Sequence, residues 1–223
     1  MLLKIRSKFQ RPENGYDPVS RSHASAYSES EFQKLDRKFL EKVCSHYGTP
    51  TGKKILDLGA GPGQYTVEFA KYGFKEAIWW DISANYKQVF LDRCRQEKIT
   101  NFQCKMNYLD EVSGNFDSVF NRICWYYCMN DDQFMKKIYL AMKEGGKGVF
   151  VINTAEKVMR RYIQNDLRRV LYRLLSTINY IFGVKLTHVA PTETRIKRIF
   201  FSYPWKYIRL EVDNENLIFY VEK

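Results

Sequence analysis

The stretch Lys53–Gln64, KKILDLGAGPGQ, decides the fold of this chain. It begins with an apolar run typical of a buried strand, passes through three glycines, and leads into YTVEFAKY, whose apolar spacing is typical of a helix. α/β folds build nucleotide pockets in this way, because glycine lets the backbone approach a ligand and the helix start offers free N–H groups. The stretch therefore predicts an α/β protein that binds a nucleotide.

Strand-like and helix-like segments alternate after this stretch. The alternation predicts a three-layer sandwich, in which helices cover both faces of a mostly parallel sheet. The segment YIRLEVDNENLIFYVE (207–222) indicates two further strands joined by a turn, which gives the sheet an antiparallel hairpin. The other expected strands lie at about 76–81, 99–105, 116–127 and 147–153, and the expected helices at about 64–72, 85–96, 131–143 and 191–201.

The flanks of this alternating region are harder to interpret. Residues 1–30 are polar and rich in turn formers, and 31–223 are expected to form a single domain. Ser28 or Ser30 is the expected cap of a helix whose apolar stripe ends near His46. Between 155 and 183, apolar residues recur at helical spacing with arginines between them, which predicts one long basic helix or two shorter ones. A helical insertion is therefore expected at about 155–200.

Composition narrows the class of protein. The chain has 223 residues and is 45% hydrophobic, which fits a packed globule rather than a disordered chain. No apolar run approaches the ~20 residues of a membrane span, and no secretory signal is evident at the start. The five cysteines are scattered and odd in number, which favours reduced thiols over disulfides or a metal site. We therefore expect a cytoplasmic protein without a metal ion.

Positive charge gathers in the C-terminal third. The net charge is +11, and 155–210 hold twelve basic residues against three acidic ones. Such a face suits an acidic acceptor, a nucleic acid or an anionic membrane surface, and it is also typical of an ordinary solvated helix face. The sequence alone leaves these alternatives open.

The glycine pattern excludes two common nucleotide motifs. The dinucleotide fingerprint G-x-G-x-x-G needs a glycine where this chain has Gln64, and Pro62 removes one N–H donor from the turn. The Walker A pattern is absent as well, because no Gly-Lys-Ser/Thr follows the glycines.

LDLGAGPGQ instead resembles motif I of the class I S-adenosylmethionine-dependent methyltransferases. The resemblance continues in order through Asp81 at the end of the second strand, NYLD at 107–110 after the third, FDSVFNRICWYY at 116–127 in the place of the fourth, and EGGKGVFVI at 144–152. It covers about half of the chain. The resemblance implies a seven-stranded sheet, a helical lid after the fifth strand, and S-adenosylmethionine as cofactor.

The family pattern also assigns roles to individual positions. Asp81 would bind both ribose hydroxyls, Asp57 would lie near the methionine ammonium, and Asn121 with Arg122 would lie beneath the sulfonium. Asn107 stands where the family more often has Asp, and its carbonyl can still accept from the adenine amino group. The full predicted cofactor set is Asp57, Gly59, Ala60, Gly61, Gly63, Asp81, Ile82, Asn107, Tyr108, Asn121 and Arg122.

The N-terminal segment GYDPVSRSHASAYSE resembles the segment Y-D-x-x-A-x-x-Y that folds over the cofactor in small-molecule members of the family. This resemblance adds Tyr16, Arg21 and Tyr27 as residues that close the pocket. The alternative is a disordered leader.

The acceptor site leaves a fainter trace. Tyr126 and Tyr127 stand where many small-molecule methyltransferases carry a His pair, and His188 is a candidate base beyond the expected lid. The simpler interpretations are core aromatics and a surface histidine. The Asn/Asp-Pro-Pro-Tyr/Phe motif of adenine and glutamine N-methyltransferases is absent, since the fourth strand ends in Asn121-Arg-Ile-Cys.

The leading hypothesis is a methyltransferase that acts on an O or N atom of a small-molecule or glycan-type, possibly acidic, acceptor. One alternative is an RNA or protein methyltransferase that uses the basic face. Another is a cofactor-binding partner protein without catalysis.

Overall fold

The seven strands form one mixed sheet in the order β3–β2–β1–β4–β5–β7–β6. This computed structural model describes residues 10–11, 14–182 and 188–223, and the side chains of 179–182 are outside that description. The strands β1 to β5 run parallel, and β7 is antiparallel to both β5 and β6. The strands are β1 Lys54–Leu58, β2 Glu76–Asp81, β3 Phe102–Met106, β4 Phe116–Arg122, β5 Met142–Asn153, β6 Tyr207–Asp213 and β7 Asn216–Glu222.

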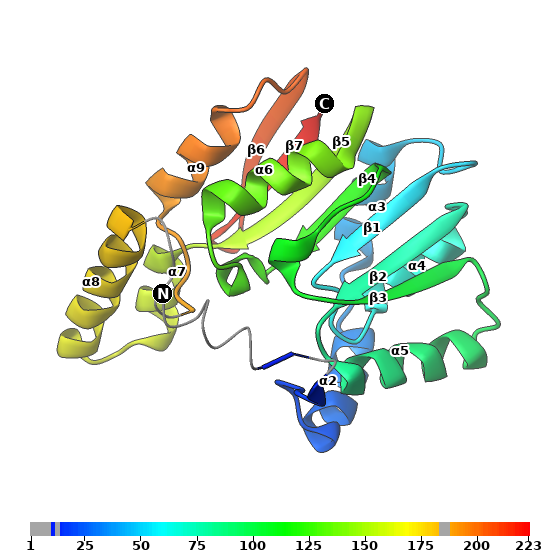
Figure 1. Cartoon of the computed structure of the whole chain (residues 1–223), viewed down its shortest axis with the longest axis horizontal. Coiled ribbons are helices and arrows are strands. Elements are labelled where there is room, and N and C mark those ends of the chain that lie inside the picture. The colour runs from blue at the N-terminus through cyan, green and yellow to red at the C-terminus, as the bar shows by residue number, and fades with distance from the viewer. Residues whose placement is uncertain (1–9, 12–13, 183–187) are drawn as a thin grey trace.

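Helices cover both faces of this sheet, so the predicted three-layer sandwich is confirmed (Figure 1). One face packs against α3, α4 and α5, and the other against α6 and α9. The helices are α2 Arg21–Gln33, α3 Arg37–Tyr47, α4 Gln64–Tyr72, α5 Ala84–Gln96, α6 Asp131–Ala141, α7 Ala155–Tyr162, α8 Asp166–Phe182 and α9 Glu193–Phe201, with short 3-10 turns η2 Leu109–Glu111 and η3 Trp125–Tyr127.

The alternation of side chains along each strand explains the two layers. In β1, Ile55 faces the layer of α3 and α4, whereas Leu56 and Leu58 face the layer of α6. Successive residues of a strand point to opposite faces, so a run that is apolar throughout must be covered on both sides. Burial of these side chains is the main stabilising contribution to the sheet.

One predicted helix is wrong in its bounds. The apolar stripe expected from Ser28 or Ser30 to His46 belongs to two helices, α2 and α3, with a break at 34–36. Asp36 causes the new start, since its carboxylate accepts a hydrogen bond from Phe39 N at 3.0 Å and so caps α3. Ser20 caps α2 in the same way, eight residues before the expected cap at Ser28.

A second boundary also differs from the expectation. The helix predicted to end near Lys143 ends at Ala141, and β5 begins at Met142 instead of after the glycines. A register shift between Phe116 and Ser118 in the pairing of β4 with β5 absorbs the extra residues. Gly145 takes a φ of +71°, and its N–H donates to Lys223 O at 2.8 Å. The glycines therefore form an irregular strand start rather than a turn.

The first and last residues of the insertion after β5 lie next to each other. Ala155 N donates a hydrogen bond to Pro191 O at 2.8 Å, and α7 and α8 lie between these two residues. The described part of the insertion holds α7 and α8, and α8 projects beside α7 away from the sheet (Figure 1). In the part of the chain that the structure describes, no helix has both the length and the apolar character needed to cross a bilayer.

Candidate functional site

The polar residues singled out in the sequence gather at the carboxyl ends of β1, β2 and β4. These three strands are neighbours, and Leu58 at the end of β1 is paired with Trp80 on one side and Asn121 on the other. From β1 the chain first adds β2 and β3 on one side of β1, and it then crosses to the other side to add β4 and β5. Open α/β sheets bind their ligands at such a switch point.

The three glycines after β1 all have positive φ, of +76°, +55° and +82°, but for different reasons. A Cβ on Gly59 would collide with the side chain of Cys124, and a Cβ on Gly63 would collide with the ring of Phe90. A Cβ on Gly61 would meet no atom within 4 Å. Packing within the protein therefore accounts for two of the glycines, and Gly61 is the one whose backbone borders open space.

Asp81 ends β2 directly beside this glycine turn. Its Oδ2 accepts a hydrogen bond from Gly61 N at 2.9 Å, and its Oδ1 accepts one from Ser83 N at 3.0 Å. Burial raises the pKa of Asp81, whereas the backbone donors of Ser83 and Gly61 favour the charged form. A carboxylate oxygen can accept more than one hydrogen bond, so both oxygens keep capacity for a ligand diol. Ile82 follows Asp81 and is partly buried.

Asp57 is the second carboxylate of the site and is buried within β1. Its Oδ2 accepts a hydrogen bond from Thr66 Oγ1 at 2.6 Å, and the backbone of Thr66 also donates to this carboxylate. Burial raises the pKa of Asp57 to about 7, although the hydrogen bond from Thr66 opposes this, and the nearby Asp81 raises the pKa further. A cation that binds beside Asp57 would favour its charged form.

Three buried amide oxygens accept no hydrogen bond from the described chain, and two of them belong to the residues around the glycine turn, namely Asn121 Oδ1 and Gln64 Oε1. The Nδ2 of Asn121 donates to Leu58 O and contacts Cys124 Sγ, both at 2.8 Å, so the orientation of this amide is fixed. An unpaired buried acceptor costs about 1–3 kcal/mol. Both oxygens are therefore suited to a ligand that brings hydrogen-bond donors.

Asn107 and Tyr108 lie in the segment that follows β3. Asn107 N donates to Asp81 O at 3.1 Å, and Asn107 Oδ1 accepts from Tyr108 N at 2.9 Å. The hydroxyl of Tyr108 donates to Gln10 O, and the guanidinium of Arg11 lies 5.3 Å from the Tyr108 ring centre. Residues 10–11 therefore lie against this end of the sheet.

Asp17 ties the N-terminal segment to the site. Its carboxylate accepts hydrogen bonds from Ser83 Oγ and Asn85 N, both at 2.8 Å, and Asn85 Nδ2 donates to Val19 O at 2.7 Å. These contacts hold the segment before α2 at the start of α5, two residues from Asp81. Tyr16 is next to this anchor and is partly buried, whereas Arg21 is exposed at the start of α2.

Aromatic residues from four segments lie near the end of β4. Tyr126 and Tyr127 in η3 have ring centres 4.2 Å apart, and His188 lies 5.3 Å from Tyr127. Tyr27 lies 6.1 Å from Tyr86. Burial, followed by the neighbouring Tyr127, raises the pKa of Tyr126, so its phenol is neutral at physiological pH. The raised pKa favours Tyr126 as a hydrogen-bond donor over a phenolate base.

Arg122 and Glu31 connect these aromatics with the glycine turn. Arg122 lies 3.6 Å from a carboxylate oxygen of Glu31 and 5.4 Å from the ring centre of Tyr65. Gln64 Nε2 donates to the same Glu31 oxygen at 3.3 Å. The predicted pair Asn121 and Arg122 is thus divided, with Asn121 buried below the turn and Arg122 directed toward α2.

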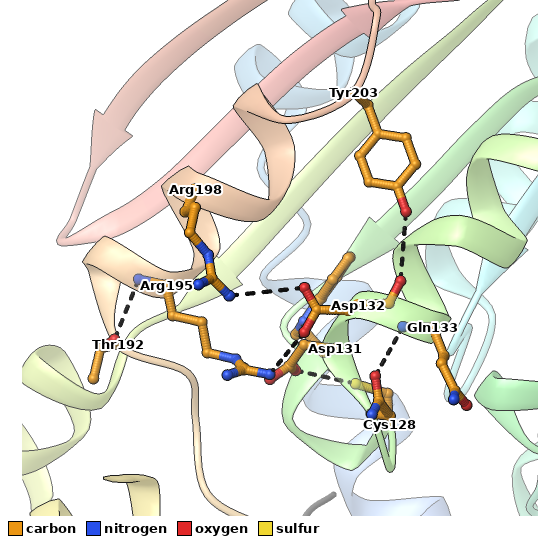
Figure 2. A network of polar contacts seen from close by, with 10 residues as sticks. Cys128, Asp131, Asp132, Gln133, Thr192, Arg195, Arg198 and Tyr203 are labelled. Carbon is orange, nitrogen blue, oxygen red and sulfur yellow. Dashed lines mark hydrogen bonds and ion pairs between the residues drawn. The ribbon is translucent and has the colours of Figure 1, made fainter. Parts of the chain in front are cut away.

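A buried polar network fixes the turn that carries Tyr126 and Tyr127 (Figure 2). Asp131 Oδ1 accepts hydrogen bonds from Trp125 Nε1 at 3.0 Å and from Cys128 Sγ at 3.3 Å. Asp131 therefore binds the first residue of η3 and the residue that follows it. Arg195 of α9 donates to Asp131 at 2.8 Å and to Asp132 at 3.1 Å. The network therefore joins η3, the start of α6 and α9.

Several residues of this site were not predicted from the sequence, namely Asp17, Glu31, Gln64, Asp131 and Arg195. Asp17 was inside the quoted Y-D pair, which is the one signal that pointed to it. Asp131 resembles an ordinary acid at a helix start, and Arg195 resembles a solvated basic residue. The five cysteines are free thiols in this structure, and the described residues contain no cluster of metal-ligating side chains.

Comparison with known proteins shows which class of protein this chain resembles. Residues 55–146 match the family model described as a methyltransferase domain. Demethylmenaquinone methyltransferase of Tropheryma whipplei is 25% identical over 145 residues, which cover 65% of this chain and 60% of that protein. The first curated relatives are matched over only about half to three fifths of their length.

Two solved structures share the fold. A SAM-dependent methyltransferase from Aquifex aeolicus has a TM-score of 0.63 at 13% identity, with 92% of this chain and 98% of that chain covered. Phosphoethanolamine N-methyltransferase 2 of Haemonchus contortus, solved in complex with S-adenosyl-L-methionine, has a TM-score of 0.63 at 20% identity and covers 93% of this chain and 45% of that chain. Residues 55–146 of this chain therefore match a methyltransferase domain, and the fold is that of the class I S-adenosylmethionine-dependent methyltransferases.

The residues of the site are chemically suited to such a cofactor. Gly61 leaves room for a ligand against the backbone, Asp81 offers acceptors for a diol, and Asn121 Oδ1 is a buried acceptor without a donor. The individual roles of the predicted cofactor and acceptor residues stay predictions.

Proposed function

We propose that this protein is an S-adenosylmethionine-dependent methyltransferase that acts on an O or N atom of a small-molecule or glycan-type acceptor. The observation that carries the proposal is the placement of Asp81 beside Gly61 at the switch point of the sheet. The cofactor supplies an electrophilic methyl carbon on a sulfonium, so the protein has mainly to align the acceptor and exclude water.

The positions of the site residues suggest which part of the cofactor each of them binds. Asp81 accepts from the ribose hydroxyls, and Asp57, oriented by Thr66, faces the ammonium end. Asn107, Tyr108 and Ile82 flank the adenine. The segment anchored by Asp17, with Tyr16 and Tyr27 nearby, covers the site and limits the access of water.

The aromatic residues support a small acceptor. Tyr126, Tyr127 and His188 lie together beyond the end of β4, and Tyr rings pack well against flat or sugar-like molecules. The neutral phenol of Tyr126 can orient an acceptor hydroxyl or amine, and an imidazole is the side chain that most often acts as a general base. The relatives named above for demethylmenaquinone and phosphoethanolamine are likewise named for small molecules.

Calorimetric titration with S-adenosylmethionine tests the cofactor assignment. We expect Asp81→Ala to weaken binding by tenfold or more, which corresponds to about 1.4 kcal/mol or more, because two charge-assisted hydrogen bonds are lost. Asp92→Ala is the matched control, since Asp92 is a surface residue of α5 that pairs with Arg95. Equal affinities for the wild type and Asp81→Ala would contradict the assignment.

A further inference from the structure

Helix α8 presents its apolar side chains to solvent. Leu167, Val170, Leu171 and Leu174 are 77%, 62%, 52% and 54% exposed. Their spacing of i, i+3, i+4 and i+7 places all four on one side of the helix, and this set is named the α8 apolar stripe here. A surface helix of a globular protein normally buries such a stripe in the core.

The opposite side of α8 is polar and faces the protein. Ser176 lies about 180° around the helix from the stripe and is buried. The hydroxyl of Tyr172 accepts a hydrogen bond from Ala190 N at 2.8 Å, and Arg169 Nε donates to Ile163 O at 2.7 Å. These contacts fix the rotation of the helix, so the outward direction of the stripe follows from its packing.

Basic residues border the stripe on both sides. Arg168 and Arg173 lie roughly 110° to either side of its centre, both are exposed, and neither has a carboxylate partner among the described residues. The nearby acids are already paired, since Asp166 contacts Arg169 at 3.1 Å and Glu215 contacts Arg160 at 3.2 Å.

Helix α7 contacts α8 and also exposes an aromatic and a basic side chain. Tyr162 at its end is 66% exposed, and the guanidinium of Arg161 lies 5.8 Å from its ring centre. An apolar surface bordered by arginines and tyrosine matches the composition of helices that lie in the plane of a membrane interface.

We propose that α7 and α8 dock on an anionic membrane surface, with the α8 apolar stripe inserted at the headgroup level and Arg168 and Arg173 on the phosphates. The charge pattern favours lipid over a second copy of this chain. Self-association through the stripe would bring the arginines of two molecules with net charge +11 together, whereas anionic lipid neutralises them. The proposal does not depend on methyl transfer.

Vesicle flotation of the full chain tests the proposal. We expect the protein to float with vesicles of equimolar phosphatidylcholine and phosphatidylglycerol, and not with phosphatidylcholine alone. Raising the ionic strength should weaken this binding, because salt screens the attraction between the arginines and the lipid. Equal binding to both kinds of vesicle, or no binding to either, would overturn the proposal.

Two variants separate the apolar and the basic parts. Leu171→Glu and the double variant Arg168→Glu/Arg173→Glu should each reduce binding to the anionic vesicles about tenfold or more. Both change exposed side chains, and thermal unfolding should confirm that the fold is retained. The matched controls lie on α6, where Leu140→Glu changes an exposed leucine and Lys136→Glu an exposed lysine. Both controls should bind like the wild type.

Analytical ultracentrifugation without lipid tests the alternative that a second copy of this chain covers the α8 apolar stripe. The proposal expects the same monomer mass for the wild type and Leu171→Glu. A wild-type dimer that Leu171→Glu dissociates would overturn the proposal, and so would unchanged vesicle binding by both α8 variants.

Discussion

At the scale of single residues, Gly59 and Gly61 lie in the same turn but are glycines for different reasons. Gly59 is needed for packing, and Gly61 leaves room for a ligand. Both have positive φ, which favours glycine. Only Gly59 lies against another side chain, that of Cys124, whereas Gly61 borders open space. The sequence pattern makes the two positions look equivalent, and the structure shows that they are not.

Gly59→Ala should destabilise the fold by about 1–3 kcal/mol, because the new methyl group collides with Cys124. Cys124→Ala should recover part of that loss, since it removes Sγ but leaves the Cβ contact and the unfavourable φ. Denaturant unfolding of both single variants and the double variant measures the coupling. Strictly additive effects would show that Cys124 is not the obstacle.

Gly61→Ala is the comparison within the same turn. It should cost only the strain of an alanine at positive φ, about 1 kcal/mol, and should weaken binding of S-adenosylmethionine more than Gly59→Ala/Cys124→Ala does. Affinity measured by calorimetry distinguishes the two.

Asp57 should make cofactor binding depend on pH near neutrality. Its pKa is raised to about 7 in the folded protein, whereas an aspartate in the unfolded chain titrates near 3.9. The folded state therefore holds this proton more tightly, so the contribution of Asp57 to stability falls as the pH rises from about 4 to about 7.

Binding of a cationic ammonium reverses that preference, because it stabilises the charged carboxylate. Affinity for S-adenosylmethionine should therefore rise from about pH 6 to about pH 8, and Asp57→Asn should flatten this profile. Calorimetry at both pH values measures the change, with Asp92→Asn as the control. A profile equally steep in Asp57→Asn would assign the pH dependence to another group.

At the scale of elements, the buried pair of Asp131 and Arg195 holds η3 in place (Figure 2). Arg195→Ala would leave a buried carboxylate without its cation, and such a loss costs about 3–5 kcal/mol. Arg198 is the matched control on the same helix, because it is exposed and lies 3.9 Å from Asp132. Arg198→Ala should cost less than about 1 kcal/mol in the same unfolding experiment. Equal costs for the two variants would show that burial of the pair is unimportant.

The regular elements of the sheet were predictable because most of the central strands are apolar and the helix after β1 has a clear stop residue. Gln64–Tyr72 ends at Gly73 as expected, and β6 and β7 are joined by Asn214 and Glu215, both at positive φ. The break between α2 and α3 was missed because the apolar stripe continues across it. The cap at Asp36 outweighs that periodicity.

The arrangement of the candidate site was predictable where it depends on the strand ends, as in the placement of Asp57, Asp81 and Asn121 near one edge of the sheet. It was not predictable where it depends on contacts between distant segments, such as Asp17 with Asn85 or Arg195 with Asp131. These pairs have no fixed spacing along the chain, so no local pattern reveals them. The same reason explains why the sequence could not show which way the apolar side of α8 faces.

At the scale of the whole molecule, Asp17 joins the segment before α2 to the start of α5. Asp17→Ala removes the acceptor for Ser83 and Asn85 and should release the N-terminal segment, which we propose covers the cofactor site. We expect dissociation of S-adenosylmethionine to become about tenfold faster, with a smaller change in the association rate. Stopped-flow measurements test this, and Asp36→Ala, which removes the cap of α3, is the control for a general loss of helix stability.

The hydrogen bond between Ala155 N and Pro191 O places the two ends of the insertion together, which affects how the insertion can evolve. Since the chain between these residues starts and ends at one place on the sheet, its length can change at small entropic cost, about 0.6 kcal/mol for each doubling. Lineages could therefore exchange this module, and with it the surface or acceptor it serves, while β5 and β7 keep their pairing.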